Sequence, residues 1–306
     1  MVIKFLNSIK SAVLLLIILL QSATIVQSQN FSLNNYHQSI EEWHKSRVEQ
    51  LKTENGWLNL AGLFWLKQGK NTFGTGTFNN IIFPKGTINE QAGYFQLTDS
   101  AVWLVTSKGT SVTLKGVPVQ KTIIYYKDSA GSPSLASGSL RFTVIRREDK
   151  IGIRLRDLKN EALIKFKGID RFTVDTAWRL TAKFQPAGFI STIAITNVLG
   201  QTTQQQSPGK LIFFIKGVQY SLDALEEDGE LFIIFADETN AIETYPSGRF
   251  LLVQKPDANG NTIIDFNKAY NPPCAFTPFA TCPLPPKQNV LPIAVTAGEK
   301  NFGEYQ

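Results

Sequence analysis

The spacing of apolar residues predicts one helix near the N-terminus. From about Asn34 to Lys52, large side chains recur every three or four residues, at Tyr36, Ile40, Trp43, Arg47 and Leu51. This spacing places them on one face of a helix. The apolar run Gly56 to Leu66 follows, and its aromatic and glycine content favours a strand over a helix.

After Gly69 the pattern changes to short β-branched and aromatic runs separated by Gly, Asn, Asp and Pro, as expected for antiparallel sheets. No alternation of strands with long helices is visible, so a doubly wound α/β fold is disfavoured. The sequence predicts a mainly β protein, an antiparallel sandwich or barrel with an N-terminal helix. Strands are expected at 80–83, 93–97, 102–106, 111–114, 117–126, 140–147, 151–157, 171–174, 178–184, 189–198, 210–216, 218–222 and 230–236, with a short helix at 159–166.

The first 28 residues have the layout of a secretory signal peptide. Lys4 and Lys10 precede the apolar run Ala12 to Leu20, which is too short for a comfortable bilayer crossing, and polar residues follow up to Ser28. We expect cleavage near Ser28 and a secreted or periplasmic protein without a membrane span. An uncleaved membrane anchor is the alternative.

The mature chain, residues 29–306, is expected to form a single β-rich domain. The Ser, Gly and Pro-rich stretch 128–139 is a loop, and it is the best candidate for a boundary between two halves or for a mobile flap.

The charge of the chain does not point to nucleic acid. The formal net charge is +6, and removal of Lys4 and Lys10 with the signal leaves 6 − 2 = +4, spread along the chain. We therefore expect no nucleic-acid partner.

The two cysteines predict one disulfide in an exported chain. Cys274 and Cys282 would close a short loop. A zinc site is disfavoured because the only histidines, His37 and His44, are far away in the sequence. No metal and no cofactor are expected.

The predicted hairpin of 140–147 and 151–157 has one cationic face. In its second arm Ile151, Ile153 and Leu155 alternate with Gly152, Arg154 and Arg156, and Arg141, Arg146 and Arg147 add charge in the first arm. Such a cluster of guanidinium groups can hold a carboxylate or phosphate. An exposed, charged sheet face is the simpler interpretation.

A second hairpin is predicted around Asn259-Gly260, because this dipeptide favours positive φ at both turn positions. This turn would pair Asp265 with Gln254 and Asn267 with Leu252. One face then mixes an acid and amides with apolar residues, as a pocket wall does; a buried structural network is the alternative. A calcium loop is disfavoured because Thr262 and Lys268 occupy positions that need Gly and an acid.

The candidate ligand-binding residues all lie near this hairpin. They are Asp237, Tyr245, Arg249, Asp265, Asn267 and Asn271. The following Pro-rich segment, Asn271 to Pro286, is stiff. It serves either as a cover over this pocket or as a clamp that pins the C-terminus.

Several motifs of this region resemble one protein family. They are Phe235-Ala236-Asp237, Thr244 to Phe250, Asp265 to Cys274, Cys282 to Pro286 and Ala297-Gly298-Glu299. Together they resemble the domain-of-unknown-function family 1684 of bacteria and archaea, from the Trp43 helix to Glu299. The resemblance implies one shared domain and no particular activity. It also keeps a reduced structural or redox role open for the cysteine pair.

No nucleophile elbow, P-loop or dinucleotide fingerprint is present. We expect a protein that binds a small polar or amphipathic molecule near 237–271. The alternatives are a metal-independent hydrolase that uses paired carboxylates from among Asp237, Glu243, Asp265 and Glu299, and a structural or interaction protein of the cell envelope.

Overall fold

The computed structural model describes residues 33–129, 131–188 and 191–303. The predicted signal peptide lies outside the described residues. The chain divides into two compact units, one up to Arg47 and one from Val48. Among the residues described, no helix has both the length and the apolar content for a bilayer crossing.

The predicted N-terminal helix is confirmed. Residues 33–52 are helical, so the helix fills the described part of the first unit and ends in the second. Leu51, in the last turn, is fully buried and belongs to a small cluster with Leu58, Ile169 and Phe276.

The prediction of a mainly β, antiparallel fold is also confirmed. In the part from 60 to 157 the strands are β1 Leu60–Trp65, β2 Gly69–Gly74, β3 Ile81–Ile82, β4 Gly93–Leu97, β5 Ala101–Thr106, β6 Thr113–Leu114, β7 Val117–Pro118, β8 Lys121–Tyr126, β9 Leu135–Ser137, β10 Leu140–Arg147 and β11 Lys150–Asp157. They form two sheets, ordered β1-β11-β10-β9-β6-β7 and β3-β2-β4-β5-β8. All their ladders are antiparallel except the short β2–β3 pair.

These two sheets share one apolar core, as a β-sandwich does. Phe73, Phe83 and Phe95 from the five-stranded side meet Phe142 of β10, with ring centroids 5.8 Å apart for Phe83 and Phe142 and 6.2 Å for Phe95 and Phe142. Ile153 and Leu155 of β11 are fully buried in the same core. The alternation read in the sequence of β11 is therefore confirmed.

The predicted short helix at 159–166 is present as α2, Glu161–Lys165. Asn160 caps it by accepting a hydrogen bond from the Ala162 amide. The predicted strand at 171–174 is absent, because residues 171–174 make only one isolated bridge, between Arg171 and Glu299.

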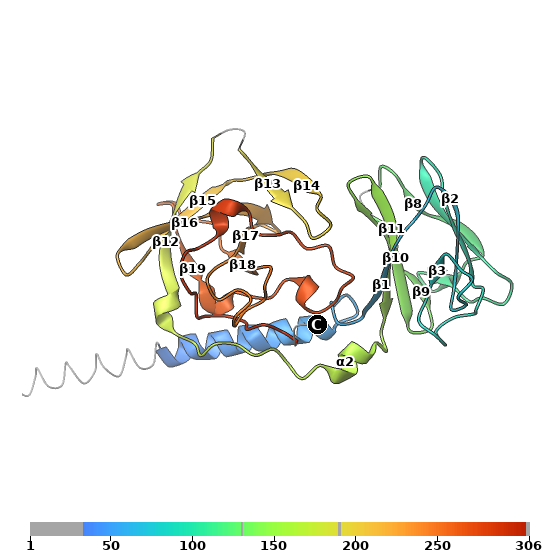
Figure 1. The fold of residues 1–306 in the computed structure, drawn as a ribbon, viewed down its shortest axis with the longest axis horizontal. Helices are drawn as coiled ribbons and strands as arrows, with labels where there is room; N and C mark the ends of the chain where they lie inside the picture. Colours follow the sequence, from blue (N-terminus) through green and yellow to red (C-terminus); the bar gives the residue numbers. More distant parts are fainter. Residues whose placement is uncertain (1–32, 130, 189–190, 304–306) are drawn as a thin grey trace, which may run out of the picture. The chain divides into compact units, whose positions relative to one another are not determined.

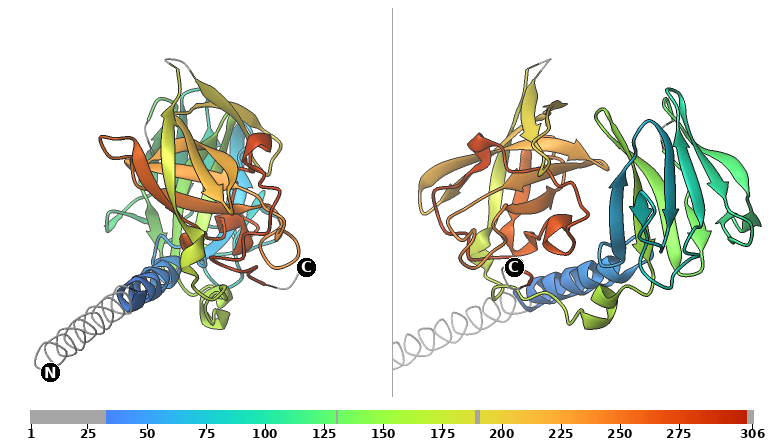
Figure 2. Two further views of the ribbon diagram at one scale, coloured as in Figure 1. Left: turned by 90° about the vertical axis from the view of Figure 1, so that its left-hand side faces the viewer. Right: turned by 45° about the vertical axis from the view of Figure 1, so that its right-hand side comes forward.

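The later strands form another six-stranded sheet, with its own core, and a two-stranded ladder. They are β12 Arg179–Pro186, β13 Thr192–Thr196, β14 Thr202–Gln206, β15 Gly209–Ile215, β16 Val218–Glu227, β17 Glu230–Phe235, β18 Arg249–Val253 and β19 Asn261–Asp265, with the short 3-10 helices η1 Thr176–Trp178, η2 Phe266–Lys268, η3 Pro273–Ala275 and η4 Lys287–Asn289. Six of these strands follow the order β18-β17-β16-β15-β12-β19, and β13 and β14 form a separate ladder. The six-stranded sheet curves into a half-barrel around Leu211, Phe213 and Phe235 (Figures 1 and 2).

The predicted pairing around Asn259-Gly260 is wrong. A turn is present, since Asp257 donates to the Asn261 carbonyl and Gly260 has φ 75°, but Asn259 keeps a negative φ. Asp265 pairs with Arg179 of β12, not with Gln254. The free edge of β18 is occupied by Tyr270, which exchanges two backbone hydrogen bonds with Phe250.

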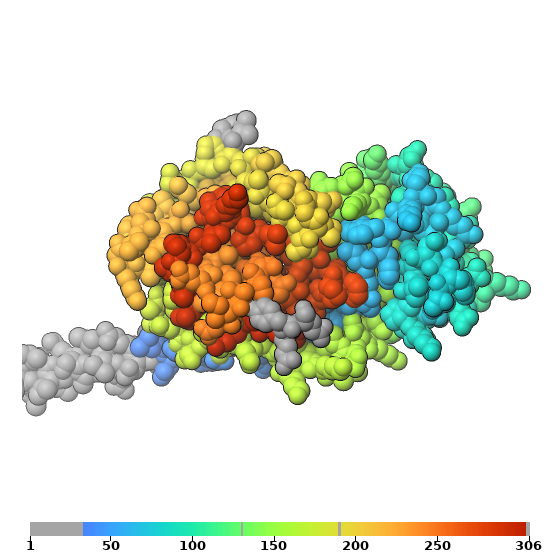
Figure 3. Space-filling view, in the orientation of Figure 1, coloured from blue at the N-terminus to red at the C-terminus, as the bar shows by residue number. Residues whose placement is uncertain are grey.

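Residues 284–291 are hydrogen-bonded to β16 and β17 of the half-barrel, to Ala236 and to β13. The Asn289 side chain is buried and binds the backbone of Asp223, at both its amide and its carbonyl, and the Ile234 carbonyl. Leu284 donates to Thr196, and Leu291 donates to Ala236. These contacts support the clamp interpretation, and the red C-terminal residues lie at the surface beside the orange ones (Figure 3).

Candidate functional site

Two of the predicted ligand-binding residues, Asp237 and Arg249, form a buried ion pair. Arg249 opens β18 opposite Phe235, the last residue of β17, and Asp237 follows two residues after Phe235. The Arg249 Nη2 atom lies 2.7 Å from Asp237 Oδ2, and both side chains are 0% exposed. The two charges therefore neutralise each other away from water.

Both partners of this pair have further protein contacts. Asp237 Oδ1 accepts hydrogen bonds from the amide and hydroxyl of Thr239, at 2.9 and 2.6 Å, and from the Val295 amide at 3.2 Å. Arg249 donates to the carbonyls of Val295, Ala297 and Glu299. Burial lowers the pKa of Arg249 below its usual value, while the Asp237 carboxylate acts in the opposite direction. The pair thus fastens the C-terminal residues to the half-barrel.

Asp265 and Asn267 form a second buried network. Asp265 caps η2, and its Oδ1 accepts hydrogen bonds from the amide and the side chain of Asn267, both at 3.1 Å. Asn267 also binds the amide and carbonyl of Asp175, at 3.0 and 2.8 Å. These contacts connect the end of β19 to the segment before η1.

Asn271 reaches the C-terminal segment. Its amide donates to Glu299 Oε2 at 2.7 Å, and its side chain donates to the Lys300 carbonyl at 2.7 Å. Glu299 is 1% exposed. Because Arg249 also contacts the Glu299 carbonyl, Asp237, Arg249 and Asn271 belong to one connected network, whereas Asp265 and Asn267 have their own.

A pocket of about 730 Å³ opens beside this network. Tyr245 is the predicted site residue that lines it, and the pocket combines aromatic rings with amide, hydroxyl and backbone groups. Its walls are Tyr245, Pro246, Cys274, Ala275, Phe276, Thr277, Pro278, Asn301, Phe302 and Gly303. The ring centroids of Phe276 and Phe302 are 4.8 Å apart, so two of the rings form one continuous apolar wall. We call this the aromatic pocket.

Tyr245 is half-buried at the rim of the aromatic pocket. Burial raises the pKa of its phenol above the ordinary value, and the Ser247 hydroxyl opposes this shift in part. The carbonyl of Tyr245 accepts a hydrogen bond of 2.6 Å from Asn240, which fixes the backbone at this point. The phenol can act as a hydrogen-bond donor or acceptor toward a bound molecule.

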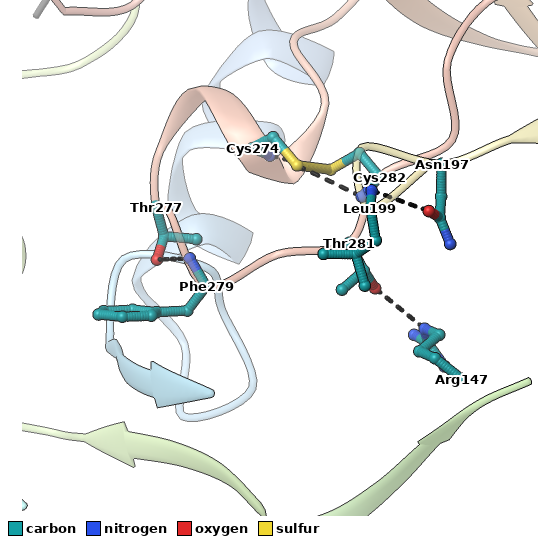
Figure 4. The surroundings of a disulfide bond; sticks show 8 residues. All are labelled: Arg147, Asn197, Leu199, Cys274, Thr277, Phe279, Thr281 and Cys282. Carbon is teal, nitrogen blue, oxygen red and sulfur yellow. Dashed lines mark hydrogen bonds between the residues drawn. A yellow bond between two sulfur atoms is a disulfide. The ribbon is translucent and has the colours of Figure 1, made fainter. Parts of the chain in front are cut away.

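The two cysteines lie side by side next to the aromatic pocket. Their Cα atoms are 6.1 Å apart, and each sulfur accepts a hydrogen bond from the backbone amide of the other residue (Figure 4). Cys282 also accepts from the Val198 amide at 3.0 Å. The loop 274–282 is thus fixed at both ends.

Sequence reasoning missed Phe276 and Phe302, two of the three aromatic residues that line this pocket. Phe276 lies in the Pro-rich segment, and Asn301 and Phe302 follow the last family-like motif, at a position where no periodicity marks a structural element. The signal in the sequence that could have identified the pocket is Phe302, an aromatic residue close to the C-terminus. Of the predicted acids, neither Asp237 nor Asp265 lines the aromatic pocket. Among the described residues no group of three His, Cys, Asp or Glu side chains is placed to hold a metal ion.

Comparison with known proteins finds one family model that matches part of this chain. Residues 164–300 match the family described as "Protein of unknown function (DUF1684)", which confirms the resemblance over this part of the chain. The similar solved structures include an uncharacterized protein of Haloarcula marismortui determined by solution NMR. It is 28% identical, with a TM-score of 0.40, and the match covers 47% of this chain and 82% of that chain. No curated protein matches.

Proposed function

We propose that this chain, whose residues 164–300 carry the DUF1684 family's domain of unknown function, is an exported protein that binds a small amphipathic molecule. The aromatic pocket carries the proposal. Ligand pockets commonly have volumes of roughly 300–1,000 Å³ and combine apolar walls with a few polar groups. A volume of about 730 Å³, with Tyr245 and Phe302 beside Asn301, meets both conditions.

The chemistry of the lining residues supports an amphipathic ligand. The rings of Phe276 and Phe302 suit a flat or aliphatic apolar group, such as one face of a sugar ring or an acyl chain. The Tyr245 phenol, the Thr277 hydroxyl and the Asn301 amide suit a neutral polar group. No acid is among the residues that line this pocket, which favours binding over hydrolysis by paired carboxylates.

Export and a disulfide belong to the same proposal. The signal-like residues 1–28 would send the chain to an oxidising compartment. There the adjacent sulfurs of Cys274 and Cys282 would be joined covalently. Because Cys274 is part of the pocket wall, this bond would hold the wall in shape before a ligand arrives.

A thermal-shift screen of the mature protein tests the proposal. Sugars, acyl compounds and nucleotides are added separately, and a ligand that binds the native state raises the melting temperature by mass action. We expect hits among the sugars or acyl compounds. The affinity of a hit is then measured by calorimetry for the wild type, Tyr245→Ala and Phe302→Ala.

Tyr126→Ala is the matched control, because this tyrosine is 55% exposed and lies in the β-sandwich. We expect Tyr245→Ala to weaken binding by about tenfold or more, corresponding to at least about 1.4 kcal/mol, and Tyr126→Ala to leave the affinity unchanged. A screen without any hit, or a hit with equal affinity for the wild type and both pocket variants, overturns the proposal.

A further inference from the structure

The cationic face of the β10–β11 hairpin gathers several arginines on one side of the sheet. In this ladder Arg156 lies opposite Arg141 and Arg154 lies opposite Thr143. Residues directly opposite each other point to the same face, so Arg141, Arg147, Arg154 and Arg156 share one face. Arg146 pairs with Ile151 and lies on the other face, which corrects the sequence-based grouping.

This face is not the open, solvated surface that the simpler interpretation of the sequence predicts. Arg147, Arg154 and Arg156 are all half-buried. The Trp57 ring lies against two of them, with its centroid 5.7 Å from Cζ of Arg154 and 5.8 Å from Cζ of Arg156. The Trp57 ring restricts the motion of both guanidinium groups. They therefore lose less conformational entropy when they bind a ligand.

The hydrogen bonds of these arginines leave donors for a ligand. Arg156 donates to the Gly56 carbonyl and to Asn59 Oδ1. Arg147 donates through Nε to the Thr281 hydroxyl at 2.9 Å, as Figure 4 shows. Arg154 lies between them, and its buried Nε has no hydrogen-bond partner in the described structure. A buried donor without a partner costs free energy, which a bound acceptor would recover.

The charges of this face are also uncompensated. Arg141 pairs with Glu54, with Nε and Oε1 2.9 Å apart, but no carboxylate among the described residues pairs with Arg147, Arg154 or Arg156. Burial and then the positive charges of Arg147 and Arg156 lower the pKa of Arg154 to about 10. Three adjacent cations without an anion destabilise one another, and an anion would reverse this effect.

We propose that Arg147, Arg154 and Arg156 form a binding site for an oxyanion, the carboxylate or phosphate group of a small molecule. Arg154 is the central donor, because a guanidinium group offers a planar pair of N–H groups that matches an oxyanion. Arg147 and Arg156 supply further charge. The Thr281 hydroxyl accepts from Arg147, so its own proton is available to donate to the anion. This site stands independently of the aromatic pocket.

The test follows the Nε–Hε resonances of the arginines by NMR in the mature protein. Inorganic phosphate and acetate are titrated separately at constant ionic strength, with chloride as the reference, so the two titrations distinguish a phosphate site from a carboxylate site. The resonance of Arg154 is identified by its loss in Arg154→Lys. We expect it to shift in a saturable manner with at least one of the two anions.

The affinity is then compared between variants with matched charge changes. Arg154→Gln is expected to weaken anion binding about tenfold or more, and Arg146→Gln, an exposed position on the opposite face, is expected to leave it unchanged. Arg154→Lys keeps the charge but loses the planar donor pair, and we expect an intermediate loss. An Arg154 resonance that neither anion shifts more than chloride does, or equal weakening in Arg146→Gln and Arg154→Gln, overturns the proposal. The wild-type titration decides the matter even if Arg154→Gln does not fold.

Discussion

The Asp237 carboxylate and the Arg249 guanidinium are in contact at 2.7 Å with neither side chain exposed to water. They are 12 positions apart in the sequence, and the Nη1 and Nη2 atoms of Arg249 also bind carbonyls of residues 295–299. Three chain segments therefore meet at one ion pair. Removal of either side chain leaves the other as a buried charge without a partner.

Asp237→Asn is accordingly expected to lower the free energy of unfolding by about 3–5 kcal/mol, because Arg249 loses its counter-charge while it remains buried. Urea denaturation of the mature protein measures the change. Glu226→Gln is the control, since Glu226 and Lys255 also lie 2.7 Å apart but are about half exposed. Such surface pairs contribute about 0–1 kcal/mol. Equal costs for the two variants would contradict a buried role for Asp237.

Gly298 is expected to tolerate no side chain. Its φ is +79°, and a Cβ there would lie 2.4 Å from the Ala269 carbonyl oxygen and 2.8 Å from that of Phe266. Gly229 also has a positive φ, +86°, but has open space around it. Gly229→Ala should cost about 1–2 kcal/mol for the left-handed backbone alone, and Gly298→Ala roughly 3–4 kcal/mol because backbone atoms must also move. If denaturation curves give both variants the same loss in free energy of unfolding, the backbone around Gly298 shifts to accommodate a side chain at little cost.

Reduction of the cysteine pair is expected to destabilise the protein. A loop of this length contributes about 2–3 kcal/mol when it is closed by a disulfide, which for a chain of this size corresponds to a fall in melting temperature of roughly 3–6 °C on adding dithiothreitol. The double variant Cys274→Ser/Cys282→Ser should melt at the lower temperature with or without reductant. A wild-type melting temperature that does not respond to reductant would argue for a reduced pair.

The titration of Tyr245 gives a pH-dependent signature of the aromatic pocket. Burial raises the pKa of this phenol above its ordinary value of 10.0 in the folded state only. The stability that follows is therefore fully present below pH 10 and is lost as the pH rises through the folded pKa. The tyrosinate absorbance of the wild type minus that of Tyr245→Phe should show one phenol that loses its proton at a pH above the ordinary value of 10.0. A Tyr245 difference curve centred at or below the ordinary value would contradict burial at the pocket rim.

The sequence was informative wherever the pattern is local. The bounds of β4 and β10 match the predicted ranges, because alternation and flanking turn residues mark them. β14, Thr202–Gln206, was missed because it is almost wholly polar, as suits an exposed two-stranded ladder. β2, Gly69–Gly74, was missed because its two glycines and its Lys-Asn pair resemble a turn.

Long-range pairing was not predictable in the same way. The Asp257 to Asn261 turn was recognised, but the neighbours of β18 and β19 depend on β17, β12 and Tyr270, which no local signal specifies. The roles of the predicted site residues depend on the same long-range contacts. Arginine is a residue type that often binds ligands. In this protein, however, the Nη1 and Nη2 atoms of Arg249 bind Asp237 and the carbonyls of residues 295–299.

The most direct test of the proposed binding function is amide chemical-shift mapping of the first ligand found in the screen. Two-dimensional NMR spectra of the mature, isotope-labelled protein are compared with and without that ligand. Binding in the aromatic pocket predicts the largest shifts at Tyr245, Thr277 and Asn301, with no comparable change in the β-sandwich strands. Shifts that concentrate elsewhere and leave these three amides unchanged would contradict the account.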